Sequence, residues 1–184
     1  IWNGLSIWNR SFTNRIKNSK IAVTDGKPPY TYYYILQKHT SHSPLAIIYP
    51  SIGEGINSTH SVLWAKLFYD AGYSVIIQGS HFQWEFVKSM PDDYAPGIPS
   101  VDAQKIRTIT AKIIEELSEK YNYEFQNKVV FGTSLGALVT LFVGAAEYKD
   151  NTLGDTKFIS ICPPVELLYA IKQIDKNSED WQKT

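Results

Sequence analysis

Ser134 lies in a five-residue motif that could supply a nucleophile. The motif reads Gly132-Thr133-Ser134-Leu135-Gly136, a Gly-x-Ser-x-Gly sequence, and it follows a short strand-like segment at residues 128–131 whose last three residues are apolar. Apolar residues at helical spacing come after it, at positions 138, 141, 142 and 145. A serine between a strand and a helix occupies a sharp turn, where flanking positions need little or no side chain. Gly132 and Gly136 meet that need, so we expect Ser134 to be a nucleophile or the relic of one, in preference to a simple turn serine.

The same motif predicts where the charge of a reaction would be held. The N–H of Leu135, at the start of the predicted helix, would point toward the oxygen that becomes negative when a serine attacks a carbonyl. Acyl transfer also needs a second donor, a base and an acid that orients the base. Those groups must come from other elements of the chain.

The remaining elements alternate between strands and helices. Continuous apolar runs predict buried strands, and apolar residues on one helical face predict helices. From residue 45 the expected order is a strand (45–49), a helix from 58 or 59 that closes at Gly72, a strand (73–77), a long loop (78–99), a helix capped by Ser100, the motif strand and its helix, a strand (158–162) and a helix (165–174). A hairpin of residues 21–23 and 30–37 precedes them. This order predicts the α/β class, with a mainly parallel sheet, helices on both faces and an N-terminal antiparallel hairpin.

Composition bounds the domain organisation and the partners. The 184 residues suit one domain over residues 1–184, with residues 1–20 as a surface lead-in. Lys plus Arg and Asp plus Glu each number 18, so neither nucleic acid nor an anionic membrane is favoured as a partner. No apolar run approaches the roughly 20 residues of a membrane span. The single cysteine, Cys162, excludes an internal disulfide and a cysteine-based zinc site, while the compartment, cytoplasmic or exported, stays open.

The hairpin, the element order and the Gly-x-Ser-x-Gly turn on the third parallel strand together resemble the α/β-hydrolases, over roughly residues 21–175. The resemblance implies a nucleophile elbow at Ser134 and a second oxyanion donor in the loop after the first parallel strand. That loop is often His-Gly-x-Gly in the family and reads Pro50-Ser51-Ile52-Gly53 here, so the N–H of Ile52 is the matching donor. The implied substrate is an ester or another acyl compound, with no metal or organic cofactor.

The histidine of the family's triad has no counterpart in the usual place. The family places its acid after the seventh strand and its histidine after the eighth, and this sequence shows neither strand. Its four histidines, His39, His42, His60 and His81, all precede Ser134. We expect His39 and His42 at the amino-terminal edge of the sheet, and His60 and His81 at the carboxyl edge with the motif. His81 is a candidate base, and a solvated or pocket-lining histidine is the alternative.

Other chemistry-bearing residues have simpler explanations. Glu166 follows the sixth strand, a position that some family members use for the acid, and an exposed carboxylate at a helix start is the alternative. Asp92 and Asp93 follow Pro91 in the long loop and are interpreted as turn residues. Cys162 is interpreted as a small core residue. The aromatic stretch at 81–94 is expected to line a substrate pocket, which favours an apolar substrate.

Three interpretations therefore stay open. The first is a serine hydrolase that acts through Ser134. The second is a non-catalytic binding or scaffold domain, or an inactive fragment of a longer hydrolase, and the third is a partnership in which a separate chain supplies the missing C-terminal strands. The strand at 158–162 would be an unpaired edge, so we expect another segment or a second copy to cover it.

Overall fold

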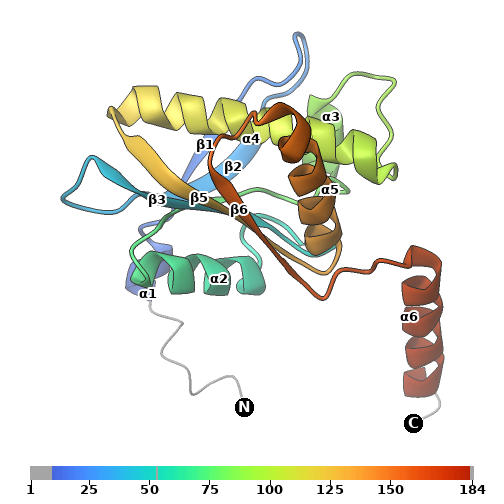
Figure 1. The fold of residues 1–184 in the computed structure, drawn as a ribbon. Helices are drawn as coiled ribbons and strands as arrows, with labels where there is room; N and C mark the ends of the chain where they lie inside the picture. The colour runs from blue at the N-terminus through green and yellow to red at the C-terminus, as the bar shows by residue number, and fades with distance from the viewer. Residues whose placement is uncertain (1–9, 53, 183–184) are drawn as a thin grey trace.

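The computed structural model describes residues 10–52 and 54–182, and these residues are built on a six-stranded sheet, whose arrangement Figure 1 shows. The strands are β1 (Lys17–Ile21), β2 (Tyr30–Ile35), β3 (His42–Tyr49), β4 (Ser74–Ile77), β5 (Glu124–Thr133) and β6 (Thr156–Ile161). Their order across the sheet is β1-β2-β4-β3-β5-β6. β1 and β2 are antiparallel to each other and β2 to β4, whereas β4, β3, β5 and β6 run parallel. The predicted class and the N-terminal hairpin are confirmed.

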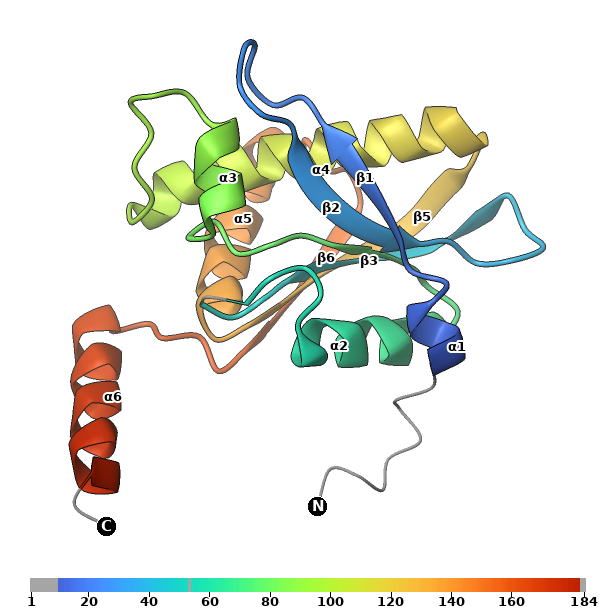
Figure 2. The ribbon, with the colours of Figure 1, turned by 180° about the vertical axis from the view of Figure 1, so that it is seen from behind.

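Helices cover the two faces of this sheet unequally. They are α1 (Arg10–Thr13), α2 (Thr59–Asp70), α3 (Trp84–Ser89), α4 (Pro99–Tyr121), α5 (Leu135–Asp150) and α6 (Leu167–Gln182). Figures 1 and 2 show α4 and α5 on one face, α2 with α1 on the other, and α6 standing apart from the sheet. Because side chains alternate along a strand, neighbouring residues serve different layers. Ile47 belongs to the core under α4 and α5, and Ile48 to the core over α2.

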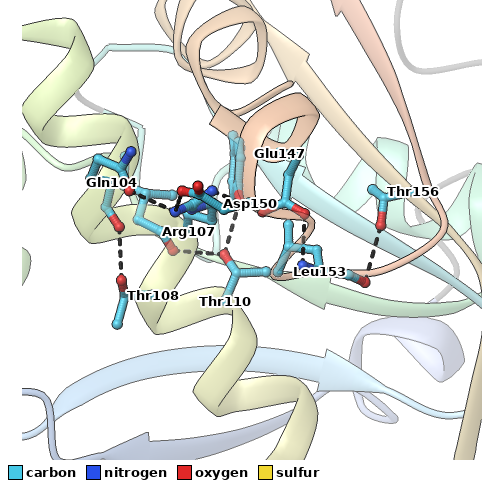
Figure 3. Close-up of polar contacts among 10 residues, drawn as sticks. Gln104, Arg107, Thr108, Thr110, Glu147, Asp150, Leu153 and Thr156 are labelled. Carbon is cyan, nitrogen blue, oxygen red and sulfur yellow. Dashed lines mark hydrogen bonds and ion pairs between the residues drawn. The ribbon is translucent and has the colours of Figure 1, made fainter. Parts of the chain in front are cut away.

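A buried ion-pair network joins α4 to α5 (Figure 3). Arg107 on α4 places Nη1 3.3 Å from Glu147 Oε1 and Nη2 2.8 Å from Asp150 Oδ2. The other carboxylate oxygen of Glu147 accepts from the backbone N–H of Leu153 at 2.7 Å, just beyond the end of α5. Breaking such a buried pair leaves an uncompensated charge, so the network fixes where α5 lies against α4. The Ser134 motif opens the opposite end of α5.

Several local expectations differ from the structure. Gly72 follows α2 at φ 92°, as expected for its end, but α4 begins at Pro99 with Ile98 as its N-cap instead of Ser100. Proline suits the first turn because its missing N–H is unpaired there anyway. The loop expected at 78–99 is interrupted by α3, whose Phe86 is 1% exposed.

The last strand is less buried than its apolar sequence predicted. β6 is the outermost strand, and its even positions face α5 while its odd positions, Ile159 and Ile161, are 42% and 37% exposed. Cys162 is exposed at φ 52° beyond the end of β6, so its interpretation as a core residue was wrong. An apolar run predicts a strand, but only neighbouring elements decide whether both faces are covered.

The N-terminal lead-in is only partly described. Residues 1–9 lie outside the described part of the chain, so that part of the expectation stays a prediction. The described remainder is not purely a surface segment, because Phe12 is 4% exposed and packs against the ring of Tyr69 on α2. β1 also begins at Lys17, four residues earlier than the hairpin strand expected from residue 21.

Candidate active site

Ser134 occupies a strained backbone turn between β5 and α5. Its dihedral angles are φ 51° and ψ −119°, outside the regions that L-residues ordinarily adopt. Such a conformation costs about 1–3 kcal/mol and persists only where the surroundings impose it. Here the Ser134 N–H donates to the carbonyl of Ile161 at 3.0 Å, and the Ser134 carbonyl accepts from the N–H of Ala137 at 3.0 Å. The side chain makes no capping hydrogen bond to α5 and is half-buried.

The two motif glycines allow this turn to pack. A Cβ atom on Gly132 would lie 2.2 Å from the carbonyl oxygen of Gly136 and 2.4 Å from Oγ1 of Thr140. A Cβ on Gly136 would lie 2.2 Å from the carbonyl oxygen of Tyr49. Real Cβ contacts are not this short, so each position requires glycine. The prediction of a sharp turn at Ser134 rested on the same requirement, that positions 132 and 136 carry little or no side chain.

The loop after β3 lies beside this turn. The Ser51 hydroxyl lies 3.2 Å from Thr133 Oγ1 and 3.4 Å from the Thr133 carbonyl oxygen, one residue before Ser134. The Ser51 N–H donates to Oε2 of Glu54 at 3.3 Å. Among the residues that the structure describes, no acceptor is found for the backbone N–H of Ile52 or of Leu135.

His81 and Asp102 form a buried pair on the other side of the same edge. His81 Nε2 lies 3.5 Å from Asp102 Oδ2, and the two side chains are 5% and 1% exposed. The Asp102 carboxylate also accepts from the hydroxyl of Tyr94 at 2.8 Å and from the N–H of Gly97 at 2.9 Å. Burial lowers the pKa of His81, and the nearby Asp102 carboxylate offsets part of that shift. Burial also raises the pKa of Tyr94, which keeps its hydroxyl a proton donor to Asp102.

A small cavity separates His81 from the start of α5. Its volume is about 10 Å³, and its lining includes His81, Gly136, Tyr49 and Val139. A space of that size approaches the room of one water molecule and is too small for an acyl chain. The aromatic stretch after β4 divides between core and surface, because Phe86 is buried while Phe82 and Trp84 are 42% and 68% exposed.

The other candidate residues lie at varied distances from this centre. Glu166 is exposed in the bend between β6 and α6. His60, in the first turn of α2, places Nδ1 2.6 Å from Oε1 of Glu54. His42 lies opposite Glu124 in the register of β3 and β5, at the start of both strands. This is the amino-terminal edge of the sheet, where His42 was expected. Asp92 is 93% exposed and pairs with Lys27, as a turn residue would.

Sequence reasoning missed the partners of two histidines. From the sequence, no role was assigned to Asp102 or to Glu54. Their contacts with His81 and His60 depend on how the loops fold back over the sheet edge. The sequence did carry a signal for the second of these contacts. Glu54 lies in a loop six residues before His60, and a carboxylate at that spacing can reach a histidine in the first turn of the following helix.

Comparisons with known proteins identify the fold. No protein-family model matches the chain, and no curated protein matches its sequence. Among solved structures, it is similar to the Pyrococcus furiosus esterase Pf2001, with a TM-score of 0.53 and 18% identity over 85% of this chain and 55% of that one. A putative carboxylesterase from Lactobacillus plantarum gives a TM-score of 0.52 and 16% identity over 83% and 62% of the two chains. A thermostable carboxyl esterase from Bacillus coagulans gives 0.51 and 17% over 73% and 41%.

These likenesses establish the α/β-hydrolase fold, as the sequence predicted. The chain spans 41–62% of the length of these three structures. Within the described residues, no helix combines the length and apolarity that crossing a bilayer requires.

Proposed function

We propose that this protein is a serine hydrolase that cleaves an ester or another acyl substrate through Ser134. The observation that carries the proposal is the strained backbone of Ser134, with φ 51° and ψ −119°, held between two positions that admit only glycine. A serine with no chemical role does not need this conformation, because an ordinary turn would connect β5 to α5 at lower cost. Strain of this kind gathers at functional sites, where it presents a side chain that regular structure would hide.

The mechanism assigns a role to each group at the sheet edge. Ser134 Oγ attacks the substrate carbonyl carbon while a base takes its proton, and the carbonyl oxygen becomes an oxyanion. The N–H groups of Leu135 and Ile52, which lack acceptors among the described residues, donate to that oxyanion. The proton passes to the leaving alcohol, and water then releases the acyl group by the same steps in reverse. His81 as base and Glu166 as acid remain proposals.

The surface around the site favours an apolar acyl group. Ile52 and Phe82 are 61% and 42% exposed on two loops near the elbow, and Trp84, the first residue of α3, is 68% exposed. These loops approach each other, because a Cβ on Gly55 would lie 3.5 Å from the side-chain oxygen of Gln83. Exposed apolar side chains on adjoining loops commonly mark a binding surface. A small-molecule substrate would bind over them.

A fluorophosphonate probe tests the nucleophile directly. The expected result is covalent labelling of the wild-type chain at Ser134, located by peptide mass spectrometry, and loss of labelling in Ser134→Ala. Ser118→Ala on α4 is the matched control and should label as wild type. Absence of labelling in the folded wild-type protein would overturn the proposal.

A non-catalytic binding domain is the second candidate. The observation in its favour is that the cavity beside the elbow is only about 10 Å³ and that His81 Nε2 already faces Asp102. This candidate predicts no labelling of Ser134, together with saturable binding of an apolar ester analogue that Trp84→Ala weakens. Labelling at Ser134 would exclude it.

A further inference from the structure

Glu54 makes contacts that hold the loop after β3 in one conformation. Its backbone N–H donates to the carbonyl of Ser51 at 3.2 Å, which ties Glu54 to the residue before Ile52. Its carboxylate Oε2 accepts from the Ser51 N–H at 3.3 Å, and Oε1 lies 2.6 Å from His60 Nδ1 on α2. Its carbonyl accepts from the N–H of Ser80, after β4, at 3.3 Å. Glu54 thus connects the loop after β3 to α2 and to the segment after β4.

We propose that Glu54 is the positioning residue of the oxyanion site, acting through its two hydrogen bonds with Ser51. This inference rests on the proposed function, because it assumes that the Ile52 N–H serves a reaction at Ser134. The Ser51 carbonyl and the Ile52 N–H belong to the same planar peptide unit, so the hydrogen bond from Glu54 to that carbonyl helps to set the direction of the Ile52 N–H. The Ser51 N–H is occupied by the Glu54 carboxylate, which leaves the Ile52 N–H as the donor free to face a ligand.

The loop after β3 is also held against the elbow. The Ser51 hydroxyl contacts Thr133, which immediately precedes Ser134. Glu54 therefore holds the loop against α2 through His60 and against the segment after β4 through Ser80, while Ser51 holds it against β5. An oxyanion donor gains its effect from being oriented before the reaction, since reorientation during the reaction would cost energy.

Positioning fits Glu54 better than proton transfer does. The Glu54 side chain is 18% exposed and both of its oxygens are engaged. Among the described contacts of Glu54 and His60, none reaches Ser134, so both act through the loop. His60 is 62% exposed, and it serves as the anchor of the carboxylate on α2.

Glu54→Ala tests this role in hydrolysis of p-nitrophenyl butyrate and in fluorophosphonate labelling. We expect kcat and the labelling rate to fall about tenfold or more, because an oxyanion donor stabilises only the transition state. KM should stay within about twofold of wild type, since the substrate is bound without that donor. Glu54→Gln keeps the length and one acceptor oxygen, so its kcat should lie between those of wild type and Glu54→Ala.

Asp70→Ala provides the matched control, because Asp70 is an ion-paired surface carboxylate at the other end of α2. It should leave kcat, KM and labelling unchanged. If Glu54→Ala does not fold, His60→Ala decides, since the exposed ring can be removed without opening the core; its kcat should fall several-fold at constant KM. If the wild-type protein is labelled but kcat is unchanged in the folded Glu54 and His60 variants, the inference about Glu54 is overturned and the proposed function stands. If the wild-type protein is not labelled, the proposed function itself is overturned.

Discussion

Gly136 lies directly against the backbone carbonyl of Tyr49. A Cβ atom on Gly136 would come within 2.2 Å of the Tyr49 oxygen and 2.5 Å of the Pro50 oxygen. The first turn of α5 therefore touches the end of β3 through main-chain atoms alone. This contact sets the separation between the loop that carries Ile52 and the turn that carries Ser134.

Gly136→Ala should destabilise the protein by about 3 kcal/mol, the upper part of the range for overpacking, because backbone atoms must move to admit the methyl group. Chemical denaturation followed by tryptophan fluorescence measures the change. Gly79→Ala is the matched control, since its Cβ would meet Ile56 at an ordinary 3.5 Å. Equal stabilities of the two variants would show that the close approach is not enforced.

Asp102→Asn should also destabilise the fold by about 3 kcal/mol. The carboxylate is 1% exposed and accepts from Tyr94 and Gly97, and its contact with His81 completes the group. An amide places an N–H₂ group where an acceptor is needed, so at least one buried donor loses its partner. Asp92→Asn, at an exposed pair with Lys27, should change the unfolding free energy by less than about 0.5 kcal/mol. A small effect at both positions would contradict this account.

The buried imidazole of His81 should make stability depend on pH. Its pKa is lowered in the folded protein, so the unfolded chain binds a proton more readily. Above the unfolded value of 6.5, His81 is neutral in both states and its full contribution to stability is present. As pH falls below 6.5 toward the lower folded pKa, the unfolded state gains the proton first, and stability declines by up to about 1.4 kcal/mol per pH unit.

His81→Gln should remove that slope, because glutamine does not titrate. Denaturation curves at several pH values between about 5 and 7.5 measure it, and the difference between wild type and variant isolates the contribution of His81. A wild-type slope retained in His81→Gln would assign the effect to other groups.

The sequence predicted the elements that local pattern determines. The apolar run at residues 45–49 and the strand before Ser134 have few alternatives, because a continuous apolar segment of that length is buried most easily in a parallel sheet. The Gly-x-Ser-x-Gly spacing similarly indicated the turn, since its steric demands are local. The strained backbone of Ser134 and the close approach of Gly136 to the Tyr49 carbonyl are what those steric demands produce in the structure.

What the sequence could not predict depends on long-range packing. α3 forms within the long loop because Phe86 packs against Tyr30, which lies far earlier in the chain, on β2. Asp102 is buried because the loop from His81 returns over the first turn of α4, and its helical position alone predicts an exposed acid. The exposure of β6 follows from its place at the end of the sheet order, which no local pattern records.

The outer edge of β6 should promote self-association of the 184-residue chain. Among residues 10–52 and 54–182, no strand pairs with its outer side, and Ile159 and Ile161 are exposed beside that edge. Open edges with apolar side chains template pairing with another strand, and a lysine there blocks it. Ile159→Lys should therefore shift the chain toward monomer, as measured by sedimentation velocity at about 100 μM. Tyr148→Lys, at a 93% exposed apolar residue on α5, should not alter the distribution, and a wild-type chain that stays monomeric at that concentration would contradict the expectation.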